Sequence, residues 1–206
     1  MSHRLGRRFF ARPTLEVAPD LLNKVLVAPG VAGRIVEVEA YRGSDDPGSH
    51  AFRGVTPRTE GMFGQAGHLY VYFTYGMHWC ANVVTDQTGT PGAVLVRAVA
   101  PLRGVALLRG RRPAAKRDVD ISNGPAKLAQ AFGIGEMHDG ADLVRAEMGV
   151  SIRDDGTPPP TSPAVGPRIG LSQGTELPWR FATDGAPEVS RPAPPSPLCE
   201  DRARPR

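Results

Sequence analysis

Short apolar stretches that alternate with polar residues, separated by glycine- and proline-containing turns, are the feature that most limits how this chain can fold. Their period of two is the spacing of side chains on one face of a β-strand. It predicts strands over 25–27, 33–41, 68–76, 79–86, 93–101, 148–152, 168–172 and 179–183. Helical spacing predicts short helices over 18–23, 102–113 and 123–134. The pattern favours an α+β fold, a single mixed domain that is strand-rich and largely antiparallel.

The 206 residues fit one domain followed by a tail. Residues 186–206 contain six prolines and no periodic apolar pattern, which predicts a domain over 1–185 and a disordered tail over 186–206. Residues 1–12 carry four arginines and no acid, and are expected to form an exposed arm or a flank of a binding surface. Residues 42–61 form a long polar loop, and such loops in compact domains are usually functional.

Several classes of protein are excluded by composition. No apolar run approaches the ~20 residues that span a bilayer, and no secretion signal is visible. We therefore expect a protein that is neither membrane-bound nor secreted, located in a bacterial cytoplasm or a eukaryotic nucleus. The histidines and the two cysteines match no metal-ligand spacing, and no phosphate-binding glycine loop is present, so neither metal nor cofactor is expected.

The basic residues are 22 arginines and three lysines, with a net charge of +4. Arginine forks suit phosphate, which raises the prospect of a nucleic-acid partner. A coding bias toward arginine, alanine, glycine and proline explains the same composition, and charge alone does not separate the two.

Two glutamates lie in the predicted strand 33–41. Alternation puts Ile35, Glu37, Glu39 and Tyr41 on one face, and the valines on the other face are expected in the core. An unpaired buried carboxylate is costly. Either at least one glutamate is a general base in a pocket, or both pair with arginines in a structural network. Arg97, in the middle of another apolar strand, is the candidate partner and could also hold a water beside a catalytic carboxylate.

The four tyrosines lie between residues 41 and 75. Tyr70 and Tyr72 share a strand face, which suits either sheet packing or the stacking of bases. Tyr75 precedes a glycine at a strand end, where it is harder to explain as core and could act as a wedge between bases.

These motifs together resemble the alkyladenine (3-methyladenine) DNA glycosylase family, from about Leu5 to Ala182. The resemblance rests on several segments in order: RIVEVEAY (34–41), His50, TPRTEGMF (56–63), LYVYFTYGMHWCANVV (69–84), VLVRA (94–98) and GPAKL (124–128). It implies a curved, largely antiparallel sheet without a helix-hairpin-helix. It also implies base excision repair of alkylated and some deaminated purines in double-stranded DNA, by a monomer without a cofactor.

The resemblance carries roles over to individual residues. Glu39 and Arg97 would be catalytic, with Glu39 deprotonating the attacking water and Arg97 helping to hold it. Four residues would bind the flipped base, with the last against the purine edge where the amino group of guanine would clash: Tyr41, His50, Tyr72 and Asn82. Five would contact DNA, led by the wedge tyrosine: Tyr75, Met77, His78, Arg58 and Lys127. His78 departs from the family pattern, in which an aromatic residue is frequent at this point.

By the same resemblance, Arg58 and Lys127 look like phosphate contacts, and no lysine is placed as an amine nucleophile. We therefore expect hydrolysis to an abasic site without strand-cleaving lyase activity. Two other interpretations stay open: a non-catalytic nucleic-acid-binding module of this fold, and a glycosidase of free nucleosides or sugars that uses Glu37 and Glu39 as its pair. The pocket carboxylate argues against the first, and the basic surface and Tyr75 argue against the second.

Overall fold

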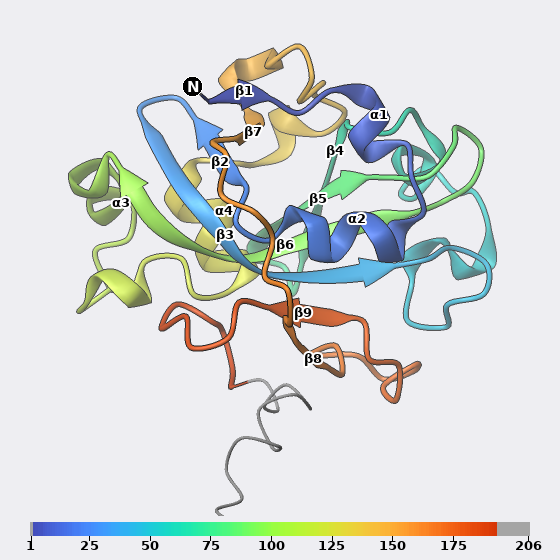
Figure 1. Cartoon of the computed structure of the whole chain (residues 1–206). Helices are drawn as coiled ribbons and strands as arrows, with labels where there is room; N and C mark the ends of the chain where they lie inside the picture. Colours follow the sequence, from blue (N-terminus) through green and yellow to red (C-terminus); the bar gives the residue numbers. More distant parts are fainter. Residues whose placement is uncertain (1, 193–206) are drawn as a thin grey trace, which may run out of the picture.

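An open, curled, antiparallel sheet organises residues 2–192, the part of the chain that the computed structural model describes (Figure 1). Its main path runs in this order: β1 (His3–Arg4), β7 (Ser151–Asp154), β2 (Val25–Ala28), β3 (Val31–Tyr41), β6 (Ala93–Arg103), β5 (His78–Val84) and β4 (Leu69–Thr74). Strand β9 (Arg180–Ala182) pairs with β3, and β8 (Ala164–Gly166) pairs with β9. The expected α+β class with a largely antiparallel sheet is confirmed.

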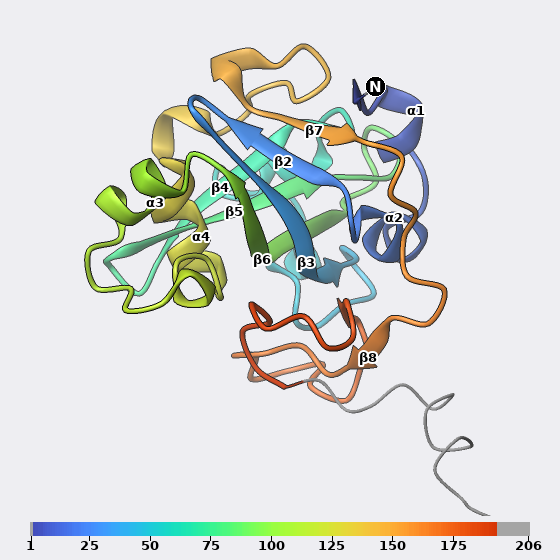
Figure 2. The ribbon, with the colours of Figure 1, turned by 60° about the vertical axis from the view of Figure 1, so that its left-hand side comes forward.

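Strand β3 is the centre of this arrangement (Figure 2). It pairs with β6 from Ala32 to Tyr41, whereas its other edge is shared. Strand β2 pairs with residues 31–34, and β9 takes over at residues 37–39. The change of partner brings the C-terminal part of the chain beside the segment that carries both glutamates.

The described residues also contain four α-helices: α1 (Arg7–Phe10), α2 (Thr14–Leu21), α3 (Val105–Arg111) and α4 (Pro125–Phe132). Pro125 begins α4, where its missing N–H costs nothing, and Gly133 ends it in the left-handed region at φ 69°. Helix α2 packs on β3 and β6, and α4 packs on β5 and β6. Both contribute to one apolar core. Within the described residues, no helix is both long and apolar enough to cross a membrane.

Side chains along the strands belong alternately to this core and to a second, smaller cluster on the other face of the sheet. On β6, for example, Val94 and Val96 belong to the main core, whereas Ala93 belongs to the second cluster. The second cluster is covered by the long loop that follows β3, through Ala51 and Met62. This loop contains two 3₁₀-helices, His50–Arg53 and Glu60–Phe63. The face beneath it is the one that carries the predicted site residues.

One expectation about β3 was wrong. Ile35 does not share a face with Glu37; it lies in the main core with Val38. The register between β3 and β6 shifts three times, and two of these shifts flank Glu37, between Ile35 and Glu37 and between Glu37 and Val38. Each shift gives one strand an extra residue, which reverses the alternation locally. At the shift between Glu37 and Val38 the extra residue is on β6, and it is Arg97.

The N-terminal residues do not form an exposed arm. Leu5 and Phe10 are buried in the main core, and the Arg7 guanidinium lies 2.6 Å from the Asp142 carboxylate. The expected closing strand over 168–172 is likewise wrong, because the strand in this region is β8 and Arg168 lies beyond its end.

The division into a domain over 1–185 and a disordered tail over 186–206 stays a prediction. Residues 186–192, however, make defined contacts with the sheet, and Ser190 bonds to the buried carboxylate of Glu37. Residues 193–206, including Cys199, lie outside the described residues.

Candidate active site

A cavity of about 190 Å³ opens on the second face of the sheet, between the loop after β3 and the segment that follows β8. That volume is below the roughly 300–1,000 Å³ of sites for drug-sized ligands, and it suits one planar group. Aromatic side chains dominate one side, and residues 169–171 line another. The lining includes Tyr41, His50, Tyr70, Tyr72, Tyr75, Cys80, Asn82, Leu95, Arg97, Pro125 and Ile169.

The aromatic wall is a set of edge-on and tilted rings. His50 and Tyr72 meet edge to face with their ring centroids 4.6 Å apart. The rings of Tyr70 and Tyr72 are tilted relative to each other, with their centroids 5.6 Å apart, and the hydroxyl of Tyr70 lies 3.1 Å from Nδ1 of His50. Burial lowers the pKa of His50, and the Arg58 charge adds to this, so the ring is held neutral at physiological pH. Tyr70, to which the resemblance carried over no role, therefore lines the cavity beside His50.

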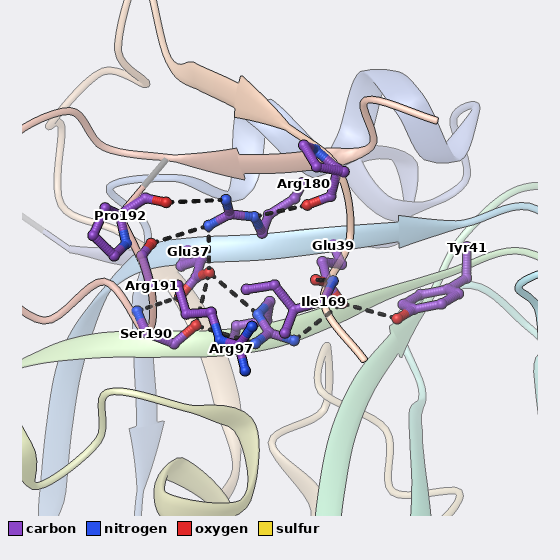
Figure 3. Close-up of polar contacts among 10 residues, drawn as sticks. Glu37, Glu39, Tyr41, Arg97, Ile169, Arg180, Ser190, Arg191 and Pro192 are labelled. Carbon is purple, nitrogen blue, oxygen red and sulfur yellow. Dashed lines mark hydrogen bonds and ion pairs between the residues drawn. The ribbon is translucent and has the colours of Figure 1, made fainter. Parts of the chain in front are cut away.

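Glu39 lies directly behind the cavity wall, with no exposed surface. Three residues that line the cavity bond to its carboxylate (Figure 3). The hydroxyl of Tyr41 donates to Oε2 at 2.8 Å, and Nη1 of Arg97 lies 3.1 Å from the same oxygen. The backbone N–H of Ile169 donates to Oε1 at 2.7 Å. The carboxylate is thus held in one orientation behind the cavity wall.

The pKa of Glu39 is raised above the ordinary glutamate value. Burial is the largest cause, because it penalises the charged form. The Arg97 charge and the hydrogen bonds from Ile169 and Tyr41 lower the pKa but do not cancel the effect of burial. A carboxylate with a raised pKa directly behind the wall of a pocket is suited to accept a proton.

Arg97 joins the two glutamates. Its Nε donates to Glu37 at 3.2 Å, while Nη1 faces Glu39 (Figure 3). Glu37 is fully buried and also receives Nη1 of Arg180 at 3.1 Å and two bonds from Ser190. Both glutamates pair with Arg97, which fits the interpretation as a structural network, and the interpretation of one of them as a general base stays a prediction. Glu37 sits in a structural arginine network, and Glu39 reaches the cavity wall.

A buried ion pair supports Tyr41 from outside the cavity. Both nitrogens of the Arg168 fork lie 2.6 Å from the Asp46 carboxylate, and neither side chain is exposed. The Arg168 guanidinium carbon lies 4.7 Å from the centroid of the Tyr41 ring. Sequence reasoning missed this pair, because an aspartate and an arginine 122 positions apart in two irregular segments leave no local signal.

Asn82 stands opposite Leu95 in the pairing of β5 with β6, and Leu95 in turn stands opposite Glu39. Its amide nitrogen donates to the backbone oxygen of Tyr70 at 3.0 Å, which fixes the side chain. Asn82 is buried and lines the cavity. It is placed to meet the edge of a planar group inserted between the aromatic rings.

The turn between β4 and β5 projects beside the cavity. Tyr75 is 78% exposed and Met77 68% exposed, and His78 is exposed as well. The backbone of Tyr75 is left-handed, with φ 51°, and Gly76 follows with φ 65°. Left-handed backbone is unusual for an aromatic residue, and such strain is concentrated at functional sites.

The two predicted phosphate contacts lie in different surroundings. Arg58 is exposed, and its guanidinium carbon lies 5.7 Å from the Tyr72 ring centroid, at the rim of the cavity. Lys127, on α4, donates to Asn123 Oδ1 at 2.7 Å and does not line the cavity. Within residues 2–192, no group of three or more histidine, cysteine or acidic side chains is arranged to hold a metal ion.

Comparison with known proteins adds a family assignment to this geometry. The family model described as Methylpurine-DNA glycosylase (MPG) matches residues 8–187. A Burkholderia lata protein named "Putative 3-methyladenine DNA glycosylase" is 56% identical over 189 residues, or 91% of each chain. Relatives with the same printed name are 49% identical in Streptomyces avermitilis, over 90% of each chain, and 45% identical in Chlorobaculum parvum, over 91% of this chain and 90% of the relative.

Proposed function

The chain belongs to the methylpurine-DNA glycosylase family, and from that premise we propose that it removes alkylated purines from double-stranded DNA and leaves an abasic site. Enzymes of this kind are hydrolases of N-glycosyl bonds. The scissile bond lies inside the duplex, so the nucleotide has to be extruded, at a cost of a few kcal/mol. An alkylated base is more easily extruded and supplies part of the selectivity.

The cavity suits an alkylated purine because of its aromatic wall. Such a base carries positive charge, and electron-rich rings favour a cation by roughly 0.5–2 kcal/mol each. We assign the stacking to Tyr41, His50 and Tyr72, with Tyr70 holding His50 by its hydroxyl. A neutral His50 avoids repulsion with a cationic base. Asn82 meets the edge of the base and disfavours guanine.

The proposed reaction is a direct hydrolysis. The bond between C1′ and the purine nitrogen breaks, and its electron pair leaves with the base and neutralises the positive charge. A water oxygen bonds to C1′, and Glu39 accepts the proton that this water loses. Arg97 holds the water and stabilises the carboxylate. The charge-delocalised sugar in the transition state also gains from the nearby carboxylate.

The remaining contacts belong to the duplex. We assign Tyr75 to the space left by the extruded nucleotide, with Met77 and His78 beside it in the minor groove. Arg58 and Lys127 contact phosphates. No lysine is among the cavity-lining residues described, which supports hydrolysis without lyase activity. We propose that the protein acts as a monomer on the chromosome, in a bacterial cell like those of its relatives.

A carboxylate that is fully buried, yet bonded to three residues of the cavity wall, is the observation that carries this proposal. A module that only binds has no use for it. A sugar hydrolase with two carboxylates would need Glu37 free, and four donors occupy Glu37.

The test is to incubate the protein with a duplex that contains one alkylated purine and, separately, with the free alkylated nucleoside. Release of free base from the duplex alone supports the proposal. Binding of the duplex without release points to a binding module, and release from the nucleoside alone points to a nucleosidase. A panel that also contains hypoxanthine decides whether deaminated purines are substrates.

A further inference from the structure

Residues 183–192, which we call the strap, run along the side of β3 that carries Glu37. The strap begins where the backbone N–H of Thr183 donates to the backbone oxygen of Val36 at 2.9 Å. It then turns through Ala186 and Val189 and brings Ser190 onto the Glu37 carboxylate (Figure 3). Ser190 lies beyond residue 187, where the match to the family model ends.

Ser190 contacts both Glu37 and Arg97, which form a buried ion pair. Its backbone N–H donates to Oε2 of Glu37 at 2.7 Å, and its hydroxyl donates to Oε1 at 2.9 Å. The same hydroxyl oxygen accepts Nη2 of Arg97 at 3.1 Å. One small side chain therefore connects the glutamate to the arginine that faces Glu39.

The end of the strap is held from the other side by Arg180 of β9. Its Nη1 donates to Glu37 and to the backbone oxygen of Arg191 at 3.2 Å, and its Nη2 reaches the backbone oxygen of Pro192 at 3.5 Å. Both arginines that pair with Glu37 are thus also bonded to the strap. The strap is part of the network and does not merely cover it.

Each nitrogen of the Arg97 guanidinium has a separate partner. Nε is bonded to Glu37, Nη2 to Ser190, and Nη1 faces Glu39. A guanidinium is planar, so the first two contacts set the plane and thereby the direction of Nη1. Without the Ser190 hydroxyl, Glu37 is the one remaining contact among residues 2–192 that holds the plane apart from Glu39 itself.

We propose that the strap is a positioning element for the general base, in which Ser190 orients Arg97 and Arg97 in turn orients Glu39. The proposal rests on the function proposed above, in which Glu39 accepts a proton from water. Ser190 does not line the cavity. It is a positioning residue and is not expected to touch the DNA.

The charge of Arg97 opposes the effect of burial on the pKa of Glu39. Loosening Arg97 therefore raises the pKa of Glu39, and a larger share of the base is protonated at a given pH. Of the other groups around Glu39, Glu37 loses the Ser190 hydroxyl but keeps its bonds from Arg97, Arg180 and the Ser190 backbone. The rest are not hydrogen-bonded to that hydroxyl, and these are Tyr41 on β3, Tyr72 on β4, Cys80 on β5 and Arg180 on β9. A shift in the pH profile then reports on Arg97.

The experiment compares Ser190→Ala with Ser190→Thr, which keeps the hydroxyl, and with Thr183→Val as the matched control. The hydroxyl of Thr183 is in the same strap and is buried without a hydrogen-bond partner among the described residues. Single-turnover release of an alkylated purine is measured from pH 5 to 9 with enzyme in excess, together with duplex binding and the melting temperature.

We expect Ser190→Ala to slow base release on the order of 10-fold near neutral pH, the effect of losing a hydrogen bond to a charged group. In this variant the acidic limb of the pH–rate profile, where the rate rises as Glu39 loses its proton, moves to higher pH, while duplex binding is unchanged. Ser190→Thr restores most of the rate, and Thr183→Val behaves as the wild type. Arg180→Lys loses the guanidinium fork that holds the strap and is expected to move the acidic limb of the profile in the same direction. This variant replaces Ser190→Ala in the test if Ser190→Ala does not fold.

Wild-type rate and an unshifted limb in Ser190→Ala overturn the proposal, and so does an equal loss in Ser190→Ala and Thr183→Val. If Ser190→Ala does not fold, an unshifted limb in Arg180→Lys has the same consequence. A wild-type protein that releases no base refutes the proposed function itself, so the two failures are distinguishable.

Discussion

Asp46 and Arg168 form a two-pronged ion pair in which neither side chain is exposed, with both N–O distances at 2.6 Å. The Arg168 guanidinium in turn lies 4.7 Å from the Tyr41 ring centroid and 5.0 Å from that of Trp179. The pair joins the loop after β3 to the segment after β8, which are two sides of the cavity. The wall formed by Tyr41 therefore depends on a charge pair that does not itself line the cavity.

Replacing Asp46 by Asn tests this dependence. Removing one charge of a buried pair leaves the other uncompensated, at a cost of about 3–5 kcal/mol. We expect urea unfolding to show a loss of this size and the KM for damaged duplex to rise.

The neighbouring Asp45→Asn is the matched control, since Asp45 pairs with Arg42 while 55% exposed and exposed pairs contribute about 0–1 kcal/mol. An equal effect of the two variants would show that Asp46 has no special role.

The raised pKa of Glu39 predicts a pH dependence of base release. A general base acts in its deprotonated form, so the rate rises with pH as Glu39 loses its proton. Because burial raises its pKa, the midpoint of this rise is expected above pH 4.5, the ordinary glutamate value. Single-turnover rates across pH measure it, and a profile flat down to pH 4 would contradict the assignment.

Tyr75→Ala tests the proposed wedge. The side chain is 78% exposed, so its removal is expected to change stability by less than about 0.5 kcal/mol. Base release from duplex DNA should fall, because the extruded state loses the ring that fills the gap. Release from single-stranded DNA, where there is no stack to fill, should change much less.

Met137→Ala provides the comparison for Tyr75→Ala. Met137 is 72% exposed and lies outside the cavity lining. Equal losses in the two variants, or equal losses on duplex and single strand, would count against a wedge.

Arg58→Ala tests the rim of the cavity. Loss of one phosphate contact weakens duplex binding for damaged and undamaged DNA alike, and it reduces the slope of log K against log salt by about 0.9. Binding measured at several salt concentrations gives this slope. Arg109→Ala, which removes an exposed arginine paired with Asp118 outside the cavity lining, is the control. An unchanged slope in Arg58→Ala would remove Arg58 from the interface.

Much of the fold could be predicted from the sequence because period-two alternation is strong in β3, β4, β5 and β6. Alternation failed at Ile35, where a bulge on β3 reverses the faces, and bulges have no reliable local signature. The N-terminal arm was misjudged because four arginines suggested exposure, although Leu5 and Phe10 carry the packing.

The candidate site could be predicted in part. Glu39, Tyr41, Tyr72 and Asn82 lie on strands whose alternation places them on one face, so the sequence brings them together. Tyr70 lies on the same strand face as Tyr72, but the spacing of the two residues does not reveal the contact between the Tyr70 hydroxyl and His50. The contributions of Arg168 and Ser190 depend on contacts over more than 90 positions, which no local pattern encodes.

Base release by the wild type and by Glu39→Gln, compared at equal occupancy of a duplex with one 3-methyladenine, tests the central claim most directly. Glutamine has nearly the same shape as glutamate but cannot accept the proton at neutral pH. We predict that the wild type releases free 3-methyladenine in a single turnover and leaves the strand intact, while Glu39→Gln binds the same duplex and loses release by at least about 100-fold. Release by Glu39→Gln at the wild-type rate would contradict the assignment of Glu39 as the base.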